Sequence, residues 1–270
     1  MHSAAPSLDE LQALFEASGG TETGYLRDHY ARFIQTRELL LQHWVPAHGR
    51  RMLDIGAHWL HQTLLFAIAG FEVTALDLPA TLDQDNVRRL AAAHSIRLLP
   101  NRDLERPAAL SALADDTFDI VLLAEVVEHL AFNPVELWRE VHRILRPGGR
   151  IVITTPNYYA LRSRLRQSWR AARLLGGGIS VDQVLSLRTH GHHWKEYSRR
   201  ELIRYFALLS PDFSCGRFAY MEKRGTQPPL RRGMAIVRAI ERMLPPLRPD
   251  MYLEVVLSRK DRGIVMQPHW

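Results

Sequence analysis

Residues 51–79 read RMLDIGAHWLHQTLLFAIAGFEVTALDLP, and this stretch decides the fold. A short apolar run ends at Asp54 and Gly56, a helical stretch follows, and a second β-branched run ends at Asp77. The pattern predicts a strand, a turn, a helix and a strand, with a carboxylate at the tip of each strand. In an open α/β sheet, the carboxyl ends of adjacent parallel strands are where a nucleoside ligand is held. We therefore expect a nucleoside site at this edge of the sheet.

The turn after the first strand departs from a glycine-rich pattern. His58 occupies the position where a second glycine is usual, and Leu60 the position where a third is common. A dinucleotide-binding dehydrogenase needs Gly-x-Gly-x-x-Gly here, and residues 56–61 supply one glycine of the three, which disfavours that class. Side chains at 58 and 60 enter space that glycine leaves to a ligand. We expect either weaker binding of the nucleoside or a different path for the loop.

The composition narrows the class of protein. With 270 residues, 46% of them hydrophobic, the chain can bury a full core as one large domain or as one domain with an elaborate insertion. No apolar run approaches the roughly 18 residues that cross a bilayer, and residues 1–15 lack the features of a signal peptide. A single cysteine, Cys215, fits a reducing compartment. These features predict a cytoplasmic protein.

The net charge of +6 hides an asymmetry between the two parts of the chain. Residues 1–150 contain 14 Lys and Arg against 20 Asp and Glu, whereas residues 151–270 contain 21 against 9. A basic second half is compatible with an anionic substrate, a membrane surface or nucleic acid. We find no RNA-binding module, so nucleic acid is the least favoured of these partners.

Strand and helix patterns continue to alternate beyond residue 79. Further strands are expected over 96–99, 118–123, 150–154 and 252–258, and helices over 60–69, 81–94, 134–144 and 199–209. Amphipathic helices are expected within 8–45, over 158–175 and near 234–244. The alternation predicts an α/β protein with a parallel sheet covered by helices on both faces.

Three motifs then identify a family. They are FDIVLLAEVVEH at 118–129, LRPGG at 145–149 and ITTPN at 153–157. Together they resemble the class I S-adenosylmethionine-dependent methyltransferases. The bacterial small-molecule and glycan type is the most similar, a type that includes the ubiquinone-biosynthesis O-methyltransferases. The likeness extends over about residues 45–160 and less closely to the end of the chain.

The resemblance implies a Rossmann-like, seven-stranded, mostly parallel sheet with an antiparallel last strand. It also implies a division of the chain into four parts. These are a helical cover (1–45), a core that binds S-adenosylmethionine (46–160), lid and substrate-recognition insertions with a core helix (161–250), and a final strand with its tail (251–270).

The resemblance also assigns cofactor contacts. The first loop would pass beneath the methionine part, Asp77 with Leu78 would bind the ribose, and Glu125 would start the segment beside the transferable methyl group. The acid of Asp103-Leu104 would accept the adenine amino group, while a backbone N–H meets a ring nitrogen. The implied cofactor-binding residues are Asp54, Gly56, Ala57, His58, Asp77, Leu78, Asp103, Leu104 and Glu125.

A second group of residues suggests the chemistry. On a helix, Glu125, Glu128 and His129 would share one face at i, i+3 and i+4, and His190, His192 and His193 follow about 60 residues later. Two carboxylates with histidines suit a divalent metal. The pattern resembles the metal site of small-RNA 2′-O-methyltransferases and of ubiquinone O-methyltransferases, with His193 as the later ligand. Without a metal, His129 or His193 is the candidate general base, because imidazole titrates near neutrality, and Glu125 completes the candidate catalytic set.

The resemblance implies O-methylation of a hydroxyl on a sugar, glycolipid or quinone-like molecule. The acceptor would be a small molecule or lipid-linked, because the basic amphipathic stretches 158–175 and 228–248 suggest peripheral contact with the inner membrane face. Two alternatives stay open: a catalytically silent binding or assembly protein, and a metal-dependent 2′-hydroxyl methyltransferase. The sequence does not specify an oligomeric state.

Overall fold

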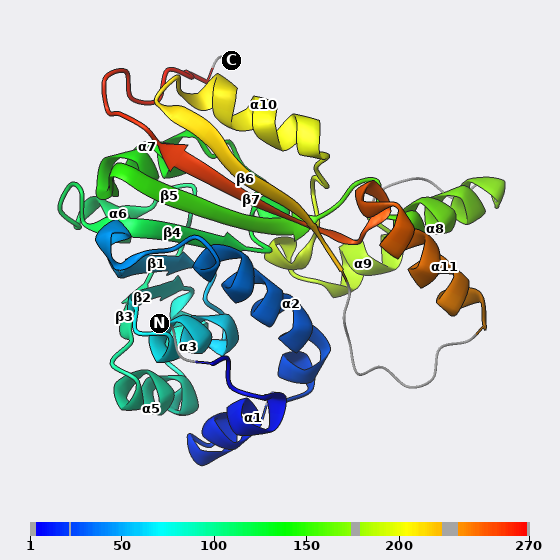
Figure 1. Cartoon of the computed structure of the whole chain (residues 1–270), viewed down its shortest axis with the longest axis horizontal. Coiled ribbons are helices and arrows are strands. Elements are labelled where there is room, and N and C mark those ends of the chain that lie inside the picture. Colours follow the sequence, from blue (N-terminus) through cyan, green and yellow to red (C-terminus); the bar gives the residue numbers. More distant parts are fainter. Residues whose placement is uncertain (1–3, 22, 174–178, 223–231, 269–270) are drawn as a thin grey trace.

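The computed structural model describes residues 4–21, 23–173, 179–222 and 232–268. Its centre is a seven-stranded sheet in the order β3-β2-β1-β4-β5-β7-β6 (Figure 1). β7 runs antiparallel to both neighbours, β5 and β6, and the other pairs are parallel. This confirms the predicted Rossmann-like sheet with an antiparallel last strand. The strands are β1 (Arg51–Ile55), β2 (Glu72–Asp77), β3 (Arg97–Pro100), β4 (Phe118–Ala124), β5 (Leu145–Pro156), β6 (Phe213–Met221) and β7 (Asp250–Leu257).

Alternate side chains of the central strands enter two different cores. Val121 and Leu123 of β4 pack in the core that α7 (Val135–Ile144) and α10 (Arg199–Leu209) share. Ile120 and Leu122 point the other way, into a core with Leu40 of α2 (Thr23–Leu41) and Phe66 of α3 (His61–Ile68). A parallel strand buried on both faces is apolar throughout, which is why the run FDIVLL is continuous. The sheet is therefore covered on both faces, as predicted.

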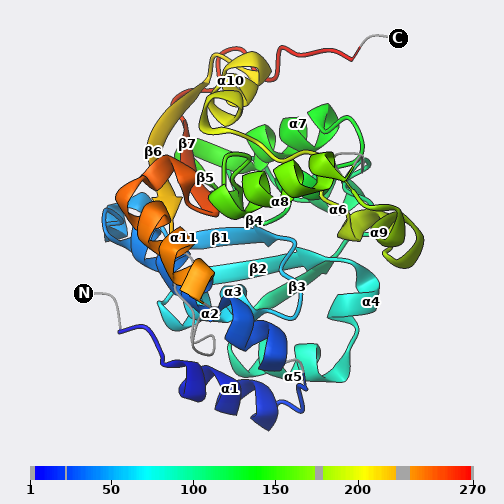
Figure 2. The ribbon, with the colours of Figure 1, turned by 90° about the vertical axis from the view of Figure 1, so that its right-hand side faces the viewer.

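Helices α8 (Leu161–Ala172), α9 (Val181–Ser186) and α11 (Arg232–Met243) stand at the end of the sheet to which the parallel strands point (Figures 1 and 2). The remaining helices are α1 (Leu8–Ala17), α4 (Pro79–Leu82), α5 (Asp85–Ala93), α6 (Ala108–Ser111) and the 3₁₀ turns η1 (Pro46–His48), η2 (Val127–His129), η3 (Thr189–Gly191) and η4 (Pro245–Leu247). Of the amino-terminal helices, α1 packs against α2 and α5, whereas α2 packs against α3 and reaches the end of β6, where Gln35 donates to the Glu222 carbonyl.

Three sequence-based element predictions need correction. The helix expected over 81–94 is two helices, α4 and α5, because Gln84 is extended and interrupts the helical backbone. The helix expected over 158–175 begins at Leu161, and residues 174–178 lie outside the described part of the chain. The strand β6 was missed because Gly216-Arg217 breaks its alternation, and its pairing with β7 shifts register between Cys215 and Phe218.

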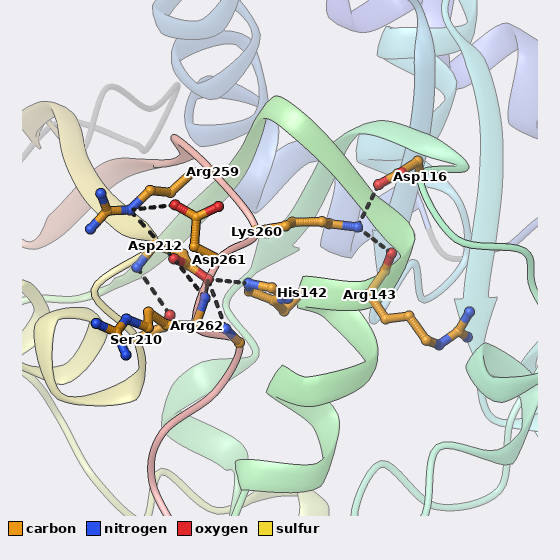
Figure 3. A network of polar contacts seen from close by, with 10 residues as sticks. Asp116, His142, Arg143, Ser210, Asp212, Arg259, Lys260, Asp261 and Arg262 are labelled. Carbon is orange, nitrogen blue, oxygen red and sulfur yellow. Dashed lines mark hydrogen bonds and ion pairs between the residues drawn. The ribbon is translucent and has the colours of Figure 1, made fainter.

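A buried carboxylate fastens the carboxyl-terminal tail to the sheet (Figure 3). Asp212 is fully buried and accepts hydrogen bonds from His142 Nε2 (3.0 Å) and from the backbone N–H groups of Arg262 and Gly263. Burial acts against ionisation, but these donors together lower the pKa of Asp212. Lys260 adds a further tie by donating to the Arg143 carbonyl at 2.6 Å. The network lies at the amino end of the parallel strands, away from the candidate site.

Candidate active site

The loop between β1 and α3 requires glycine at one position. Gly56 has φ +80, and a Cβ there would lie 2.5 Å from Val126 Cγ2, so both its conformation and the available space exclude a side chain. The N–H groups of Gly56 and Ala57 donate to the Leu76 carbonyl at 2.9 and 3.2 Å. These bonds place the start of the loop directly beside the end of β2.

His58 and Leu60 hold the backbone that glycine would otherwise provide. Both are left-handed, with φ +50 and +67, which costs an L-residue about 1–2 kcal/mol each. The His58 ring lies 3.8 Å from the ring of Trp59 and 5.0 Å from that of Tyr25, centroid to centroid, and the Leu60 side chain is fully buried. Packing of these side chains therefore sustains the strained turn. Both positions thus keep a left-handed backbone in spite of their side chains.

Asp77 stands at the carboxyl end of β2, where the ribose contact is predicted. Its Oδ2 accepts the His58 N–H at 2.7 Å and its Oδ1 accepts the Leu78 N–H at 2.6 Å. Each carboxylate oxygen retains a lone pair for a further donor. The arrangement ties the position-58 backbone to the acid, so the loop and the predicted ribose contact form one rigid unit.

Asp103 and Leu104 follow β3, at the predicted adenine position. The buried Asn101 shapes this loop, because its Nδ2 donates to the Asp103 carbonyl (2.8 Å) and its Oδ1 accepts the Ala109 N–H. The Asp103 side chain is exposed and Leu104 is half-buried. The two residues lie next to β2, on the same edge of the sheet as Asp77.

Asp54 differs from Asp77 because it is sealed inside the protein. Its Oδ2 accepts the Thr63 hydroxyl at 2.6 Å, and it is 2% exposed. Burial raises the pKa of Asp54 to about 7, although the Thr63 hydrogen bond opposes the shift. Asp54 therefore links the end of β1 to α3 inside the protein, beneath the loop that joins them.

Glu125 does not begin a helix, contrary to expectation. It has φ +56, which an α-helix cannot contain, and the turn η2 that follows is 3₁₀. The predicted shared face of Glu125, Glu128 and His129 is therefore wrong. Instead, Glu125 Oε2 faces Arg32 Nη1 of α2 at 3.0 Å, and both side chains are largely buried.

Glu128 is fully buried at the end of β5. Its Oε2 accepts the Thr155 hydroxyl at 2.9 Å, and its Oε1 has no hydrogen-bond partner among the described residues. Burial, reinforced by the nearby charge of Glu125, raises the pKa of Glu128 well above its usual value. The Glu128 carbonyl accepts the Trp194 N–H at 2.8 Å, which docks the histidine-rich segment here.

That docking brings His129 and His193 together. Their ring centroids are 4.6 Å apart, and His129 Nδ1 lies 3.1 Å from the His192 carbonyl. A carbonyl only accepts, so Nδ1 carries a proton, and in the neutral imidazole the lone pair is then on Nε2. Nε2 lies 4.0 Å from Glu128 Oε1.

Glu128, His129 and His193 each offer one ligand atom, and these atoms lie within 4.8 Å of one another. Of the predicted metal set, Glu125 lies outside this group. His192 is buried, with its Nε2 3.0 Å from the Gln183 carbonyl, and the side chain of His190 lies outside the described part of the chain. The structure therefore assembles one carboxylate and two imidazoles.

A family model described as a methyltransferase domain matches residues 24–207, which includes every strand from β1 to β5 and the whole of this site. The chain belongs to the methyltransferase domain family. The prediction of a methyltransferase is thereby confirmed.

Relatives with known names agree with this family. The methyltransferase is 32% identical over 173 residues to a ubiquinone biosynthesis O-methyltransferase of Caulobacter sp. (strain K31), a match that covers 62% of this chain and 60% of the relative. It is 30% identical over 176 residues to the protein of the same name from Caulobacter vibrioides, covering 64% and 63%. The methyltransferase thus matches less than two thirds of the length of these relatives.

A solved structure shows the same fold. The S-adenosylmethionine-dependent methyltransferase of Mesorhizobium loti superposes with a TM-score of 0.52 at 16% identity, covering 82% of this chain and 97% of that one. At this identity the likeness concerns the fold alone.

Several residues of the methyltransferase site were missed in the sequence. Arg32 and Tyr25 come from α2, about 90 residues before Glu125. Thr155 was seen only as part of a motif, and Asn101 not at all. Nothing in the local pattern of α2 distinguishes Arg32 from its neighbouring arginines, because its role arises from the packing of that helix against the site.

A cavity of about 490 Å³ lies between α2 and β6, and none of the residues that line it belongs to the candidate site. It is lined by residues of α2 and of the end of β6, and by Arg248. None of the helices in the described ranges is sufficiently long and apolar to cross a membrane.

Proposed function

We propose that the protein transfers the methyl group of S-adenosylmethionine to a hydroxyl oxygen of a small-molecule acceptor. The observation that carries this proposal is His129, whose Nδ1 is held by the His192 carbonyl, with Nε2 4.0 Å from Glu128 Oε1 and the ring 4.6 Å from that of His193. An imidazole held in one tautomer at the carboxyl edge of the sheet is a suitable base for a hydroxyl proton. The names of the relatives in Caulobacter support an oxygen acceptor.

The reaction would be a direct displacement. The acceptor oxygen forms a bond to the methyl carbon as the carbon–sulfur bond breaks, the electron pair of that bond returns to sulfur, and the hydroxyl proton passes to His129 Nε2. Positioning of the two reactants supplies most of the rate, and proton removal is a smaller contribution. Asp77 would hold the ribose, Asp103 the adenine, and Gly56 to His58 the methionine part.

The same residues fit a divalent cation. Glu128 Oε1 lacks a partner among the described residues, and with the two imidazoles it forms a mixed oxygen and nitrogen donor set. When bound, a divalent metal lowers the pKa of a coordinated hydroxyl. Glu128, His129 and His193 would hold it, and the His192 carbonyl would fix the His129 tautomer.

We also propose that the acceptor is presented at a lipid surface. Leu165 and Trp169 of α8 and Ile236 and Met243 of α11 are exposed among arginines, on the side where the parallel strands end. Apolar and cationic side chains on one surface favour contact with anionic lipids. Flotation with phosphatidylglycerol vesicles should weaken when Trp169 is changed to Ser. Equal flotation of this variant and the wild type would remove the membrane part of the proposal.

Calorimetric titration with S-adenosylhomocysteine tests the cofactor site first, because a catalytically silent protein without a working site would not bind it. Transfer of labelled methyl groups to catechol, sugar and quinol acceptors then tests the reaction. His129→Asn keeps a donor for the His192 carbonyl but removes Nε2, and it should lower the rate by about 10²–10⁴-fold with unchanged cofactor affinity. His43→Asn, at an exposed position, is the matched control. An unchanged rate in His129→Asn contradicts the proposed base.

The metal has its own test. If a cation is used, chelation should abolish transfer and added Mg²⁺ or Zn²⁺ should restore it, while Glu128→Gln should no longer respond to either treatment. Full activity after chelation, together with an active Glu128→Gln variant, rules out the cation and leaves His129 as the base.

A further inference from the structure

Helices α8 and α11 each contain an arginine with buried nitrogens that have no hydrogen-bond acceptor among the described residues. Arg238 of α11 has Nε and Nη2 buried with no hydrogen-bond partner among the described residues. Arg162 of α8 is similar at Nη2, while its Nε lies 3.4 Å from Glu241 Oε1 without the geometry of a hydrogen bond. A buried N–H without an acceptor is costly, so these groups are poised for an acceptor-rich partner.

The surroundings of these arginines carry a net positive charge. A small cavity is lined by Arg238, Arg242 and Arg248, against Glu222 and Glu241. Arg248 is fully engaged, because it pairs with Glu222 at 2.9 Å and donates to the carbonyls of Tyr220, Glu241 and Arg242. Arg162 and Arg238 keep buried donors without a hydrogen-bond partner among the described residues, and both lie near Glu241: Arg162 through its 3.4 Å contact and Arg238 in the lining of the same cavity.

This arginine cluster adjoins the candidate active site. Asn157, just beyond β5, donates from Nδ2 to the Pro246 and Arg248 carbonyls, both at 2.8 Å. Two residues earlier, Thr155 holds Glu128. The same Arg248 and Glu222 also line the cavity of about 490 Å³ between α2 and β6. The arginine cluster thus adjoins this cavity, and Asn157 ties Arg248 to the end of the strand that carries Thr155.

We propose that Arg162 and Arg238 form a binding site for a phosphate group carried by the methyl acceptor. The unused groups of Arg162 and Arg238 are donors, and the arginines that line the small cavity outnumber the carboxylates of Glu222 and Glu241. Such a surrounding suits a group with several acceptor oxygens, no donors and more than one negative charge. The phosphate belongs either to a soluble phosphorylated acceptor or to a lipid headgroup. The inference rests on the proposed function for its meaning, since it names the class of acceptor, but the anion site can be tested without the reaction.

Inorganic pyrophosphate is the probe for a soluble phosphate. It is titrated calorimetrically, at constant ionic strength, into protein loaded with S-adenosylhomocysteine. Arg238→Gln and Arg162→Gln should each weaken its binding about tenfold, because each removes charge-assisted hydrogen bonds. Arg162→Lys should retain only part of the affinity, since an ammonium group keeps the charge but not the planar fork. Arg200→Gln, on exposed α10, is the control and should bind like the wild type.

Flotation with phosphatidylglycerol vesicles is the second arm. Pyrophosphate binding that is lost in both glutamine variants supports a soluble phosphate. Flotation that is lost in both variants, without measurable pyrophosphate binding, supports a lipid headgroup. The proposal is overturned if neither probe binds, or if Arg200→Gln weakens binding as much as Arg238→Gln. Binding of S-adenosylhomocysteine is followed in every variant, so failure of the cofactor site is distinguishable from failure of the anion site.

Discussion

The left-handed conformation of Leu60 is strained, and the burial of its side chain offsets that strain. Its φ of +67 disfavours any side chain, yet the side chain is fully buried beside α3. Removing the side chain should cost about 2–5 kcal/mol in either small variant. Glycine, unlike alanine, adopts the left-handed conformation without strain, which lowers its cost by about 1 kcal/mol. Leu60→Gly should therefore be less destabilising than Leu60→Ala.

Leu64 provides the matched control for that comparison. It is also fully buried, but it lies within α3 in ordinary helical conformation. There glycine should be worse than alanine by about 1 kcal/mol. Urea unfolding of the four variants measures both orders. If glycine is the worse substitution at position 60 as well, the left-handed strain inferred for this loop is wrong.

Individual residues also show what the sequence could reveal about the site. Asp77 was predictable, because a carboxylate at a strand end must lie at the edge of a parallel sheet. His193 was found only through the resemblance to a family, and the structure brings it to His129 through the Trp194 backbone bond. Arg32 was not predictable, since its partner Glu125 is 93 residues away. Pairings over such separations depend on how helices pack, which no local pattern contains.

At the scale of elements, the ion pair between Arg32 and Glu125 joins α2 to the loop that follows β4. Arg32 and Glu125 are 14% and 13% exposed in their side chains, so breaking the pair leaves a largely buried charge. Arg32→Ala should lower the free energy of unfolding by about 3 kcal/mol. Combining it with Glu125→Gln should cost less than the two single effects added together, because no carboxylate then remains uncompensated.

Arg27 supplies the control for this double-mutant cycle. It is exposed on the same helix, so Arg27→Ala and Glu125→Gln should be additive in urea unfolding. Additivity of the Arg32 pair as well would show that the ion pair does not hold α2 on the loop.

Elements were predicted well where the hydrophobic period was clean, and poorly where the backbone was irregular. α10 begins and ends at Arg199 and Leu209 as expected, because Ser198 and Glu201 form a capping box around an amphipathic pattern. The turn η2 was predicted as a helix because i, i+3 and i+4 spacing cannot reveal the positive φ of Glu125. β6 escaped detection because its irregular register hides the period of two.

For the whole molecule, the charge asymmetry of the sequence corresponds to a division in space. The acidic first part supplies β1 to β4 and the aspartates of the proposed cofactor site. The basic second part supplies α8 and α11, which stand at the end of the sheet to which the parallel strands point (Figure 2). An anionic acceptor would meet the arginines before it meets the cofactor. Such a field raises the rate of encounter and makes it sensitive to salt. If the acceptor carries phosphate, kcat/KM should therefore fall as ionic strength rises, while kcat changes little.

The stability of the whole molecule should show two opposing dependences on pH. Asp54 has its pKa raised to about 7, mainly by burial, so its contribution is present below about pH 4 and is lost as pH rises to 7. His61 has its pKa lowered to about 3, again mainly by burial, so its contribution is lost as pH falls from 6.5 towards 3. Each slope is about 1.4 kcal/mol per pH unit, and the two oppose each other between about pH 4 and 6.5.

Single variants separate the two slopes. Asp54→Asn keeps an acceptor for the Thr63 hydroxyl, and its free energy of unfolding, measured relative to the wild type, should increase by about 1.4 kcal/mol per pH unit from pH 4 to 7. For His61→Asn, the free energy of unfolding relative to the wild type should fall as pH rises from 3 to 6.5. In this range the wild type gains stability with pH because its buried imidazole is neutral, and the variant has no imidazole. Comparison with the wild type cancels the contributions of other groups, including Asp212. Urea unfolding at half-unit steps of pH measures both differences. If the free energy of unfolding of both variants changes with pH as that of the wild type does, burial does not displace the pKa of either Asp54 or His61.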